Sequence, residues 1–254
     1  MRRLAIQAVT LSLFRFTSLP VQLWAFAQMG LMRPALARVP GIGFWKLCGS
    51  GTGEGFTPIP NRQVIAILAT WPDPATAEAA TAGAAPFRRL ARRAQECWTV
   101  VMEPVASRGR WSGVTPFAPQ PSATMPPPAE SADGLPLAAL TRATVRGRHL
   151  LRFWQRAPAI SRVIGSDPNV IFKIGVGEVP WLHQVTFSIW PDAATMAAFA
   201  RGDGPHGRAI AAVRAGGWFD EELYARFRVV SARGSWGGSD PLATRFPALN
   251  REAA

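Results

Sequence analysis

The sequence predicts an α+β protein in which two copies of a β-α-β-β-α-β unit follow one another along 254 residues. Three observations support this. The motif Trp-Pro-Asp occurs twice, at residues 71–73 and 190–192, and an alanine-rich stretch follows each copy. Short runs of bulky apolar residues, typical of strands, precede each motif. A stretch rich in proline and small residues, 106–140, separates the two halves. Self-similarity of this kind indicates a repeated structural unit.

The elements of the first half follow in order. A strand is expected in VTLSLFRF (9–16), and VQLWAFAQMGLM indicates the helix after it. A second strand is expected in PGIGFWKL (40–47) and a third in RQVIAILATW (62–71). Asp73 is then placed to cap the next helix, and the strand CWTVVMEPV (97–105) closes the unit.

The second half repeats this order. Strands are expected in GRHLLRFW (147–154), PNVIFKIG (168–175), HQVTFSIW (183–190) and ARFRVV (225–230), and Asp192 is the expected helix cap. Each half is then a ferredoxin-like unit. Two such sheets can bury their open faces against each other, so we expect two tandem ferredoxin-like repeats forming an intrachain pseudo-dimeric α/β barrel.

The domain boundaries follow from this repeat. Residues 1–105 form the first repeat, 106–140 a Pro-rich linker, 141–234 the second repeat and 235–254 a tail.

The charge and the cysteines limit the function only loosely. The net charge of +12 suggests an anionic partner, such as nucleic acid, an acidic protein or a membrane face. Because the sequence contains no helix-turn-helix, zinc-finger or RNP-type pattern, we expect no nucleic-acid partner. Two distant cysteines without a CxxC spacing favour a reduced, cytoplasmic setting. The N-terminus resembles a signal peptide, but Arg15 interrupts its apolar run, which favours a strand and a helix.

The three histidines are His149, His183 and His206. The first two fall on expected strands. His206 stands 16 residues after Trp190, and Phe87 stands 16 residues after Trp71 in the other half. An imidazole in one copy where the other has an apolar ring indicates that the two copies are used differently, and neutral imidazole suits a metal or haem iron. A solvent-facing histidine at a helix start is the alternative.

Other candidate residues lie around the expected hairpins. The stretch LCGSGTGEGF (47–56) matches no phosphate-binding motif and is expected to form a wide hairpin loop, with Cys48 as a less favoured thiolate ligand of iron. Glu178 lies in the corresponding loop of the second half and could act as a general acid or base, or have no catalytic role.

Four basic residues occupy matching positions in the two expected repeats. If they face the cavity, they are suited to bind haem propionates or dioxygen, and otherwise they are solvated side chains. They are Arg15, Lys46, Arg152 and Lys173.

Four long stretches closely resemble the spheroidene monooxygenases of carotenoid synthesis: PGIGFWKLCGSGTGEGFTPIPN (40–61), ALTRATVR (139–146), IGSDPNVIFKIGVGEVPWLHQVTFSIWPD (164–192) and GPHGRAIAAVRAGGWFDEELYARFRV (204–229). The resemblance implies a haem-dependent monooxygenase that hydroxylates the C-2 end of an acyclic carotenoid and then oxidises it to a ketone, as in the conversion of spheroidene to spheroidenone. It also implies dioxygen as co-substrate and reduced ferredoxin as electron donor. A carotenoid is insoluble in water, so peripheral contact of a cytoplasmic protein with the cytoplasmic or photosynthetic membrane is expected.

A more distant likeness concerns the iron ligand. In small haem-degrading monooxygenases with a dimeric barrel, a strand ends in Trp and a His begins a later helical piece, which corresponds here to Trp190 and His206. Residues 157–166 lack the histidine that haem proteins of the chlorite-dismutase type place there. This leaves His206 as the expected ligand and His183 as the alternative.

The resulting hypothesis assigns two groups of site residues. Arg152 and Glu178 are the candidate catalytic residues, and His206, Trp190, Arg15 and Lys173 are the candidate haem-binding residues. A non-catalytic carotenoid- or haem-binding protein on the same scaffold is the alternative function.

Overall fold

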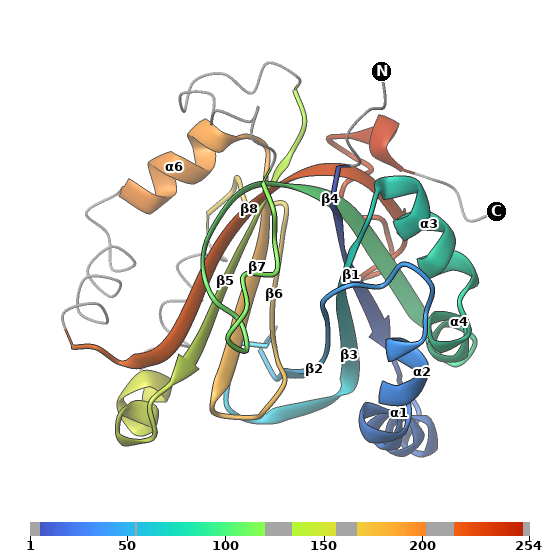
Figure 1. Cartoon of the computed structure of the whole chain (residues 1–254), viewed down its shortest axis with the longest axis horizontal. Coiled ribbons are helices and arrows are strands. Elements are labelled where there is room, and N and C mark those ends of the chain that lie inside the picture. Colours follow the sequence, from blue (N-terminus) through green and yellow to red (C-terminus); the bar gives the residue numbers. More distant parts are fainter. Residues whose placement is uncertain (1–5, 54, 120–133, 156–166, 202–215, 251–254) are drawn as a thin grey trace.

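The computed structural model describes residues 6–53, 55–119, 134–155, 167–201 and 216–250. Within them the chain forms a mixed α/β fold around a closed, eight-stranded antiparallel barrel (Figure 1). The strands are β1 (Ala8–Arg15), β2 (Trp45–Gly51), β3 (Pro60–Trp71), β4 (Glu96–Gly109), β5 (Leu137–Val145), β6 (Phe172–Gly177), β7 (His183–Trp190) and β8 (Phe219–Gly234). The longer helices are α1 (Leu19–Leu31), α2 (Arg33–Ala37), α3 (Pro74–Gly83), α4 (Ala85–Ala91) and α6 (Ala193–Arg201).

The two halves of the chain occupy adjacent parts of the barrel wall. The strand order is β1-β3-β2-β6-β7-β5-β8-β4, so within each half the fourth strand is followed by the first, third and second. The seam between β4 and β8 is long and runs from Trp98 to Gly109. The other seam, between β2 and β6, consists of two residue pairs around Ser50. The barrel wall is therefore weakly closed on one side.

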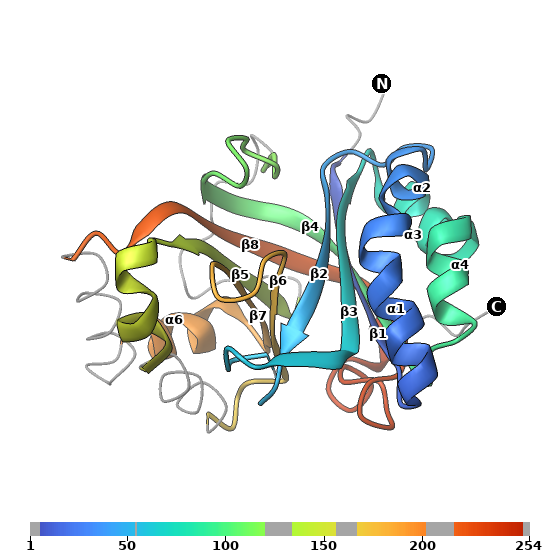
Figure 2. The same ribbon diagram turned by 90° about the horizontal axis from the view of Figure 1, so that it is seen from below.

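Apolar side chains fill the barrel and also cover the outside of the first sheet. Leu11, Trp98 and Phe227 belong to the interior cluster. A separate cluster, which includes Trp71 and Phe87, lies between the first sheet and α1–α4, and these helices lie together on one flank in Figure 2.

The expected helix caps after both Trp-Pro-Asp motifs are confirmed. Asp73 Oδ1 accepts a hydrogen bond from the Thr76 backbone N–H at 2.8 Å, and Asp192 Oδ1 accepts one from Thr195 at 2.7 Å. None of the described helices is both long and apolar enough to cross a membrane.

The strand expected at 147–154 is wrong. A 3₁₀ helix, Gly147–His149, and helical residues 150–155 occupy this segment. The first strand of the second half is β5, whose alternate residues Ala138 and Leu140 enter the barrel core. The shared pattern of an apolar residue followed by Arg-Phe, at 14–16 and 151–153, misled the assignment, because β5 is rich in alanine and threonine and lacks the bulky pattern of β1. Both β4 and β5 extend into the segment expected as a linker, whose residues 120–133 lie outside the described chain.

Candidate active site

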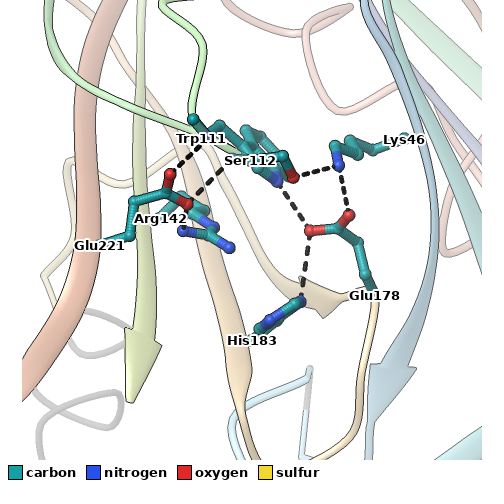
Figure 3. A network of polar contacts seen from close by, with 8 residues as sticks. Lys46, Trp111, Ser112, Arg142, Glu178, His183 and Glu221 are labelled. Carbon is teal, nitrogen blue, oxygen red and sulfur yellow. Dashed lines mark hydrogen bonds and ion pairs between the residues drawn. The ribbon is translucent and has the colours of Figure 1, made fainter. Parts of the chain in front are cut away.

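Glu178 is the centre of a polar network at one end of the barrel (Figure 3). It follows β6, and its Oε1 lies 2.7 Å from Lys46 Nζ on β2. Its Oε2 accepts a hydrogen bond from Trp111 Nε1 at 2.7 Å and lies 3.5 Å from His183 Nδ1. The carboxylate thus joins β2, the segment after β4, and the two strands β6 and β7.

A second ion pair lies beside Glu178. Arg142 points into the barrel from β5, is 1% exposed and pairs with Glu221 of β8. Its guanidinium also lies 5.7 Å from the centroid of the Trp111 ring. Glu221 accepts backbone hydrogen bonds from Ser112 at 2.9 Å and from Gly113 at 2.7 Å. Both of these residues have positive φ, so the turn presents two N–H groups to one carboxylate.

These contacts keep both carboxyl groups ionised. Burial by itself raises the pKa of Glu178, but the nearby His183 imidazole, hydrogen bonds from Lys46 and Trp111 and the charge of Lys46 outweigh it and lower the pKa to about 2. Burial also raises the pKa of Glu221, and the backbone N–H groups of Gly113 and Ser112 with the charge of Arg142 bring it below its usual value. At neutral pH Glu178 can accept a proton but has none to donate.

His183 has the setting of an oriented imidazole. Its Nδ1 is buried, faces a carboxylate at 3.5 Å and makes no hydrogen bond within the described residues. A carboxylate behind one ring nitrogen is the arrangement that orients metal-ligating histidines. No group of three or more His, Cys, Asp or Glu side chains in the described part of the chain is arranged to hold a bare metal ion.

Arg15 and Lys173 line one cleft at the other end of β6, beside the weak seam of the barrel. The cleft has a volume of about 500 Å³, and Phe172 and Trp236 contribute to its apolar lining. Arg15 forms an ion pair with Glu96 at 2.8 Å and lies 4.3 Å from the centroid of the Trp236 ring. The structure thus brings together two predicted haem-binding residues but separates them from Glu178 and His183.

The outer face of the second sheet is polar and partly open. Thr141 of β5 stands opposite Thr186 of β7, and both are partly exposed. The buried cluster described there contains only Trp190 and Met196. Trp190 is 2% exposed and donates a hydrogen bond to Ser188 Oγ at 2.9 Å. The centroid of its ring lies 5.1 Å from the centroid of the Phe199 ring.

The remaining predicted residues lie apart or outside the described chain. Arg152 is exposed in the helical segment 150–155. His206 lies outside the described residues. Burial raises the pKa of the Cys48 thiol far above its usual value, so this cysteine stays protonated and is a poor thiolate ligand.

The four basic residues do not occupy matching positions, contrary to expectation. Lys46 stands opposite Leu68 and faces the barrel interior, whereas Lys173 stands opposite Ser188 on the outer side. The extra residue between Pro40 and the lysine in the first half shifts the register by one, which turns the side chain to the other face of the sheet.

The register also separates the two arginines. Arg15 stands opposite Val64, which lies seven residues before Trp71. The matching position before Trp190 is His183, and the residue opposite it is Thr144 rather than Arg152.

The Gly-rich stretch forms the expected β2–β3 hairpin loop, and its glycines have a structural reason. The Gly55 backbone, at φ +93°, packs directly on Gly175 of β6, and a Cβ on Gly55 would lie 1.8 Å from the Gly175 carbonyl oxygen. Ser50 Oγ donates to the same carbonyl at 2.8 Å. The loop therefore joins the two halves where their strands pair least.

Sequence reasoning missed Arg142, Glu221 and Trp111. The first two stand at inward positions of strands whose neighbouring inward residues are Leu140 and Leu223. A charged residue on the apolar face of an alternating strand was the available signal, and it required the correct placement of β5. Trp111 fell within the segment interpreted as a linker.

Comparison with known proteins supports the fold. No family model matches the chain. A crystal structure of aldoxime dehydratase has a TM-score of 0.58 and 13% identity, covering 89% of this chain and 82% of that one. A complex of aldoxime dehydratase with butyraldoxime has the same TM-score, 10% identity, and covers 89% and 80%. At such low identity these similarities concern the fold alone.

Comparison with curated sequences identifies the family. The spheroidene monooxygenase of Rhodobacter capsulatus is 50% identical over 245 residues, which cover 96% of this chain and 98% of that protein. The enzyme of the same name from Cereibacter sphaeroides is 49% identical over 249 residues, covering 98% and 74%. That of Rubrivivax gelatinosus is 34% identical over 220 residues, covering 85% and 80%. Because this identity extends along nearly the whole chain, the protein belongs to the spheroidene monooxygenase family.

Proposed function

We propose that the protein is a haem-dependent monooxygenase that hydroxylates the C-2 end of an acyclic carotenoid and then oxidises the same carbon to a ketone. Dioxygen is the co-substrate, and reduced ferredoxin supplies the electrons. The observation that carries this proposal is the identity of about one half with two proteins named spheroidene monooxygenase. The haem, the electron donor and the position of attack follow from the family resemblance. The proposal treats the halves as tandem ferredoxin-like repeats, which the shared strand order supports.

The second half is the proposed haem-binding half. His206 is the proposed iron ligand, with His183 as the alternative, and Trp190 would flank the macrocycle. The partly exposed Thr141 and Thr186 support this location, because they leave a polar, thinly covered face beside that indole. Lys173 and Arg226, which stand on the same side of the sheet, suit two propionates.

When bound, haem supplies the activation of dioxygen, which no side chain provides. The chain positions the carotenoid end and excludes water from it. Glu178, as an ionised carboxylate, accepts a proton at Oε1 or Oε2 or stabilises the charge of Lys46, and the cationic Arg152 is the second candidate catalytic residue. The apolar lining of the cleft at Phe172 and Trp236 suits a polyene chain.

An absorption spectrum tests the haem and its ligand. We expect purified protein to show a Soret band that shifts on reduction and on addition of carbon monoxide. His206→Ala should lose at least nine-tenths of the bound haem while far-UV circular dichroism stays unchanged. The matched variants His183→Ala and His149→Ala should keep it. Loss of haem in His183→Ala with retention in His206→Ala would make the alternative histidine the ligand.

Turnover distinguishes the enzyme from a binding protein. The haem-loaded protein is incubated with an acyclic carotenoid, ferredoxin, its reductase and oxygen, and the products are separated by chromatography. We expect a hydroxylated product that is converted to a ketone. Unchanged carotenoid bound to haem-loaded protein would support the non-catalytic alternative.

A further inference from the structure

α1 is a surface helix that contains no charged residue. Its solvent-facing residues recur every three to four positions and form one stripe of apolar or small side chains. The large members are Leu19 at 58% exposure, Leu23 at 55%, Phe26 at 70% and Leu31 at 72%. An apolar stripe of this length on the surface of a protein indicates a face that another apolar phase covers.

Four arginines border this stripe. They lie on and just after α4, they are all exposed, and together with Trp24 of α1 they line a hollow of about 500 Å³ between the two helices. They are Arg88, Arg89, Arg92 and Arg93. The Arg93 guanidinium lies 4.3 Å from the centroid of the Trp24 ring, and Arg89 Nη1 lies 3.5 Å from Gln28 Oε1. None of the ion pairs found among the described residues includes any of the four.

We propose that this face, the apolar stripe of α1 with the arginines of α4, docks the protein on a bilayer that contains anionic lipid. Figure 2 shows α1 and α4 side by side on one flank of the molecule. Exposed Leu and Phe side chains enter the acyl boundary of a bilayer, an indole settles at its interface, and guanidinium groups bind the phosphates of the headgroups. Across this face the apolar stripe is followed by the Trp24 indole and then by the arginines. A membrane surface has its acyl chains, interface and headgroup phosphates in the same order.

Charge decides against a second copy of the chain as the occupant. A two-fold symmetric contact through the stripe would bring the four arginines of each copy to the same interface. Like charges at such distances oppose association. An anionic surface is instead attracted by the same four side chains and by the net charge of +12.

The docking face begins next to the cleft. Arg15, which lines the cleft, lies four residues before the start of α1, and Gln22 Nε2 of α1 donates to the Phe16 and Thr17 carbonyl oxygens at 3.2 and 3.0 Å. Docking would therefore hold the cleft close to the lipid phase. Use of the cleft by a carotenoid rests on the proposed function, whereas the docking itself does not.

Sedimentation with vesicles tests the docking in the full chain. We expect the protein to bind vesicles of phosphatidylcholine with one-third phosphatidylglycerol, and to bind vesicles of phosphatidylcholine alone at least tenfold more weakly. Arg88→Gln with Arg92→Gln should weaken binding to the anionic vesicles about 25-fold, or about fivefold per arginine. Leu23→Ser with Phe26→Ser should weaken it at least tenfold. Added salt should reverse binding of the wild-type protein.

Matched variants make the test specific. Arg108→Gln with Arg110→Gln removes the same charge from another exposed segment, and Leu151→Ser changes a side chain that is 75% exposed elsewhere. Both should bind like the wild type. An equal loss in Arg108→Gln with Arg110→Gln would overturn the proposal in favour of net charge. A dimer in sedimentation equilibrium that Leu23→Ser with Phe26→Ser dissociates would overturn it in favour of a second copy.

The readout is independent of turnover. The docking variants should retain haem content and activity on detergent-solubilised carotenoid. Vesicle binding without turnover would support the docking and contradict the proposed function. Turnover without vesicle binding would support the proposed function and contradict the docking.

Discussion

The outer faces of the two sheets share a register but differ in chemistry. Trp71 stands opposite Ala8 in the first sheet, and Trp190 stands opposite Leu137 in the second, so the two tryptophans align the faces. The residues two, four and six positions before Trp71 give the first face apolar side chains. The residues at the same distances before Trp190 give the second face hydroxyl and amide groups. The pairs are Ala69 and Ser188, Ile67 and Thr186, and Ile65 and Gln184.

Burial follows the same division. Ile67 and its partner Ser12 are fully buried beneath the helices of the first half, and Ser12 Oγ accepts a hydrogen bond from Thr99. Their counterparts Thr186 and Thr141 are partly exposed. The first face is thus used for packing, and the second retains polar groups that packing does not need. One scaffold with one stabilising face and one adaptable face is suited to hold a ligand without loss of the fold.

The barrel interior shows a second difference at one register position. Leu13 stands five residues after Ala8 in β1, and Arg142 stands five residues after Leu137 in β5. Leu13 belongs to the apolar interior cluster, whereas Arg142 pairs with Glu221 at the same depth of burial. The second half therefore carries a buried guanidinium paired with a partly exposed carboxylate where the first carries a packed side chain.

Breaking this ion pair should have the largest effect on stability. Arg142→Met leaves Glu221 without its charged partner, and we expect a loss of about 3–5 kcal/mol in the free energy of unfolding. The double variant with Glu221→Gln should regain more than half of that loss, because neither charge is then left alone. Leu13→Met, at the matching position, should cost less than about 1.5 kcal/mol.

Urea unfolding followed by tryptophan fluorescence measures these differences. A loss below about 1 kcal/mol in Arg142→Met would mean that water or another group replaces the pair at no cost. The two interiors would then be energetically alike despite their different residues.

Exchange of the matching outer-face residues should have the next largest effect. Ile67→Thr removes a methyl group from a fully buried position and buries a hydroxyl group, so we expect a loss of about 2–4 kcal/mol. Thr186→Ile makes the reverse change on a partly exposed face and should alter stability by less than about 0.5 kcal/mol. Both values come from chemical unfolding at one pH.

A bulky residue on the second face should act on ligand binding instead. Thr186→Phe is expected to reduce haem content several-fold while the unfolding midpoint of the haem-free protein stays within error, and Ile67→Phe serves as the overpacked control. If Thr186→Ile costs as much as Ile67→Thr, the two faces are packed alike and the proposed haem location is wrong.

Every described strand except β5 overlaps a stretch in which the sequence predicts a strand. The Trp-Pro-Asp motifs place β3, β7 and the capped helices well, because a strand, a turn and a cap each leave a local signal. β5 was missed because alanine and threonine make up most of it, and the helical segment after it was interpreted as a strand. The face of the sheet on which a predicted site residue lies depends on the register of its strand, which a single inserted residue changes.

The charged network around Glu178 can be recognised only from the fold. Lys46, Glu178 and Trp111 come from three segments far apart in the sequence, and only barrel closure brings Lys46 Nζ and Trp111 Nε1 each to 2.7 Å from the Glu178 carboxylate. Glu178 was predicted as a site residue from its place in a hairpin loop, but its partners were not. His206, the residue with the most specific expected role, lies outside the described chain, so that role stays a prediction.

The network should also make the second half's end of the barrel the acid-sensitive part of the molecule, with the smallest effect of the three. The pKa of Glu178 is about 2 in the folded protein, below its ordinary value of 4.5. A lowered pKa contributes stability above about pH 4.5, and this contribution is lost as pH falls toward 2. The shift corresponds to roughly 3 kcal/mol. Glu178→Gln keeps an acceptor for Trp111 but removes the charge, so wild type and variant should differ by this amount at pH 6. By pH 3 the difference should fall to about half.

A difference that stays constant from pH 6 to pH 3 in urea unfolding would show that Glu178 is not held ionised by Lys46 and His183, and that this end of the barrel is no more charge-dependent than the first half.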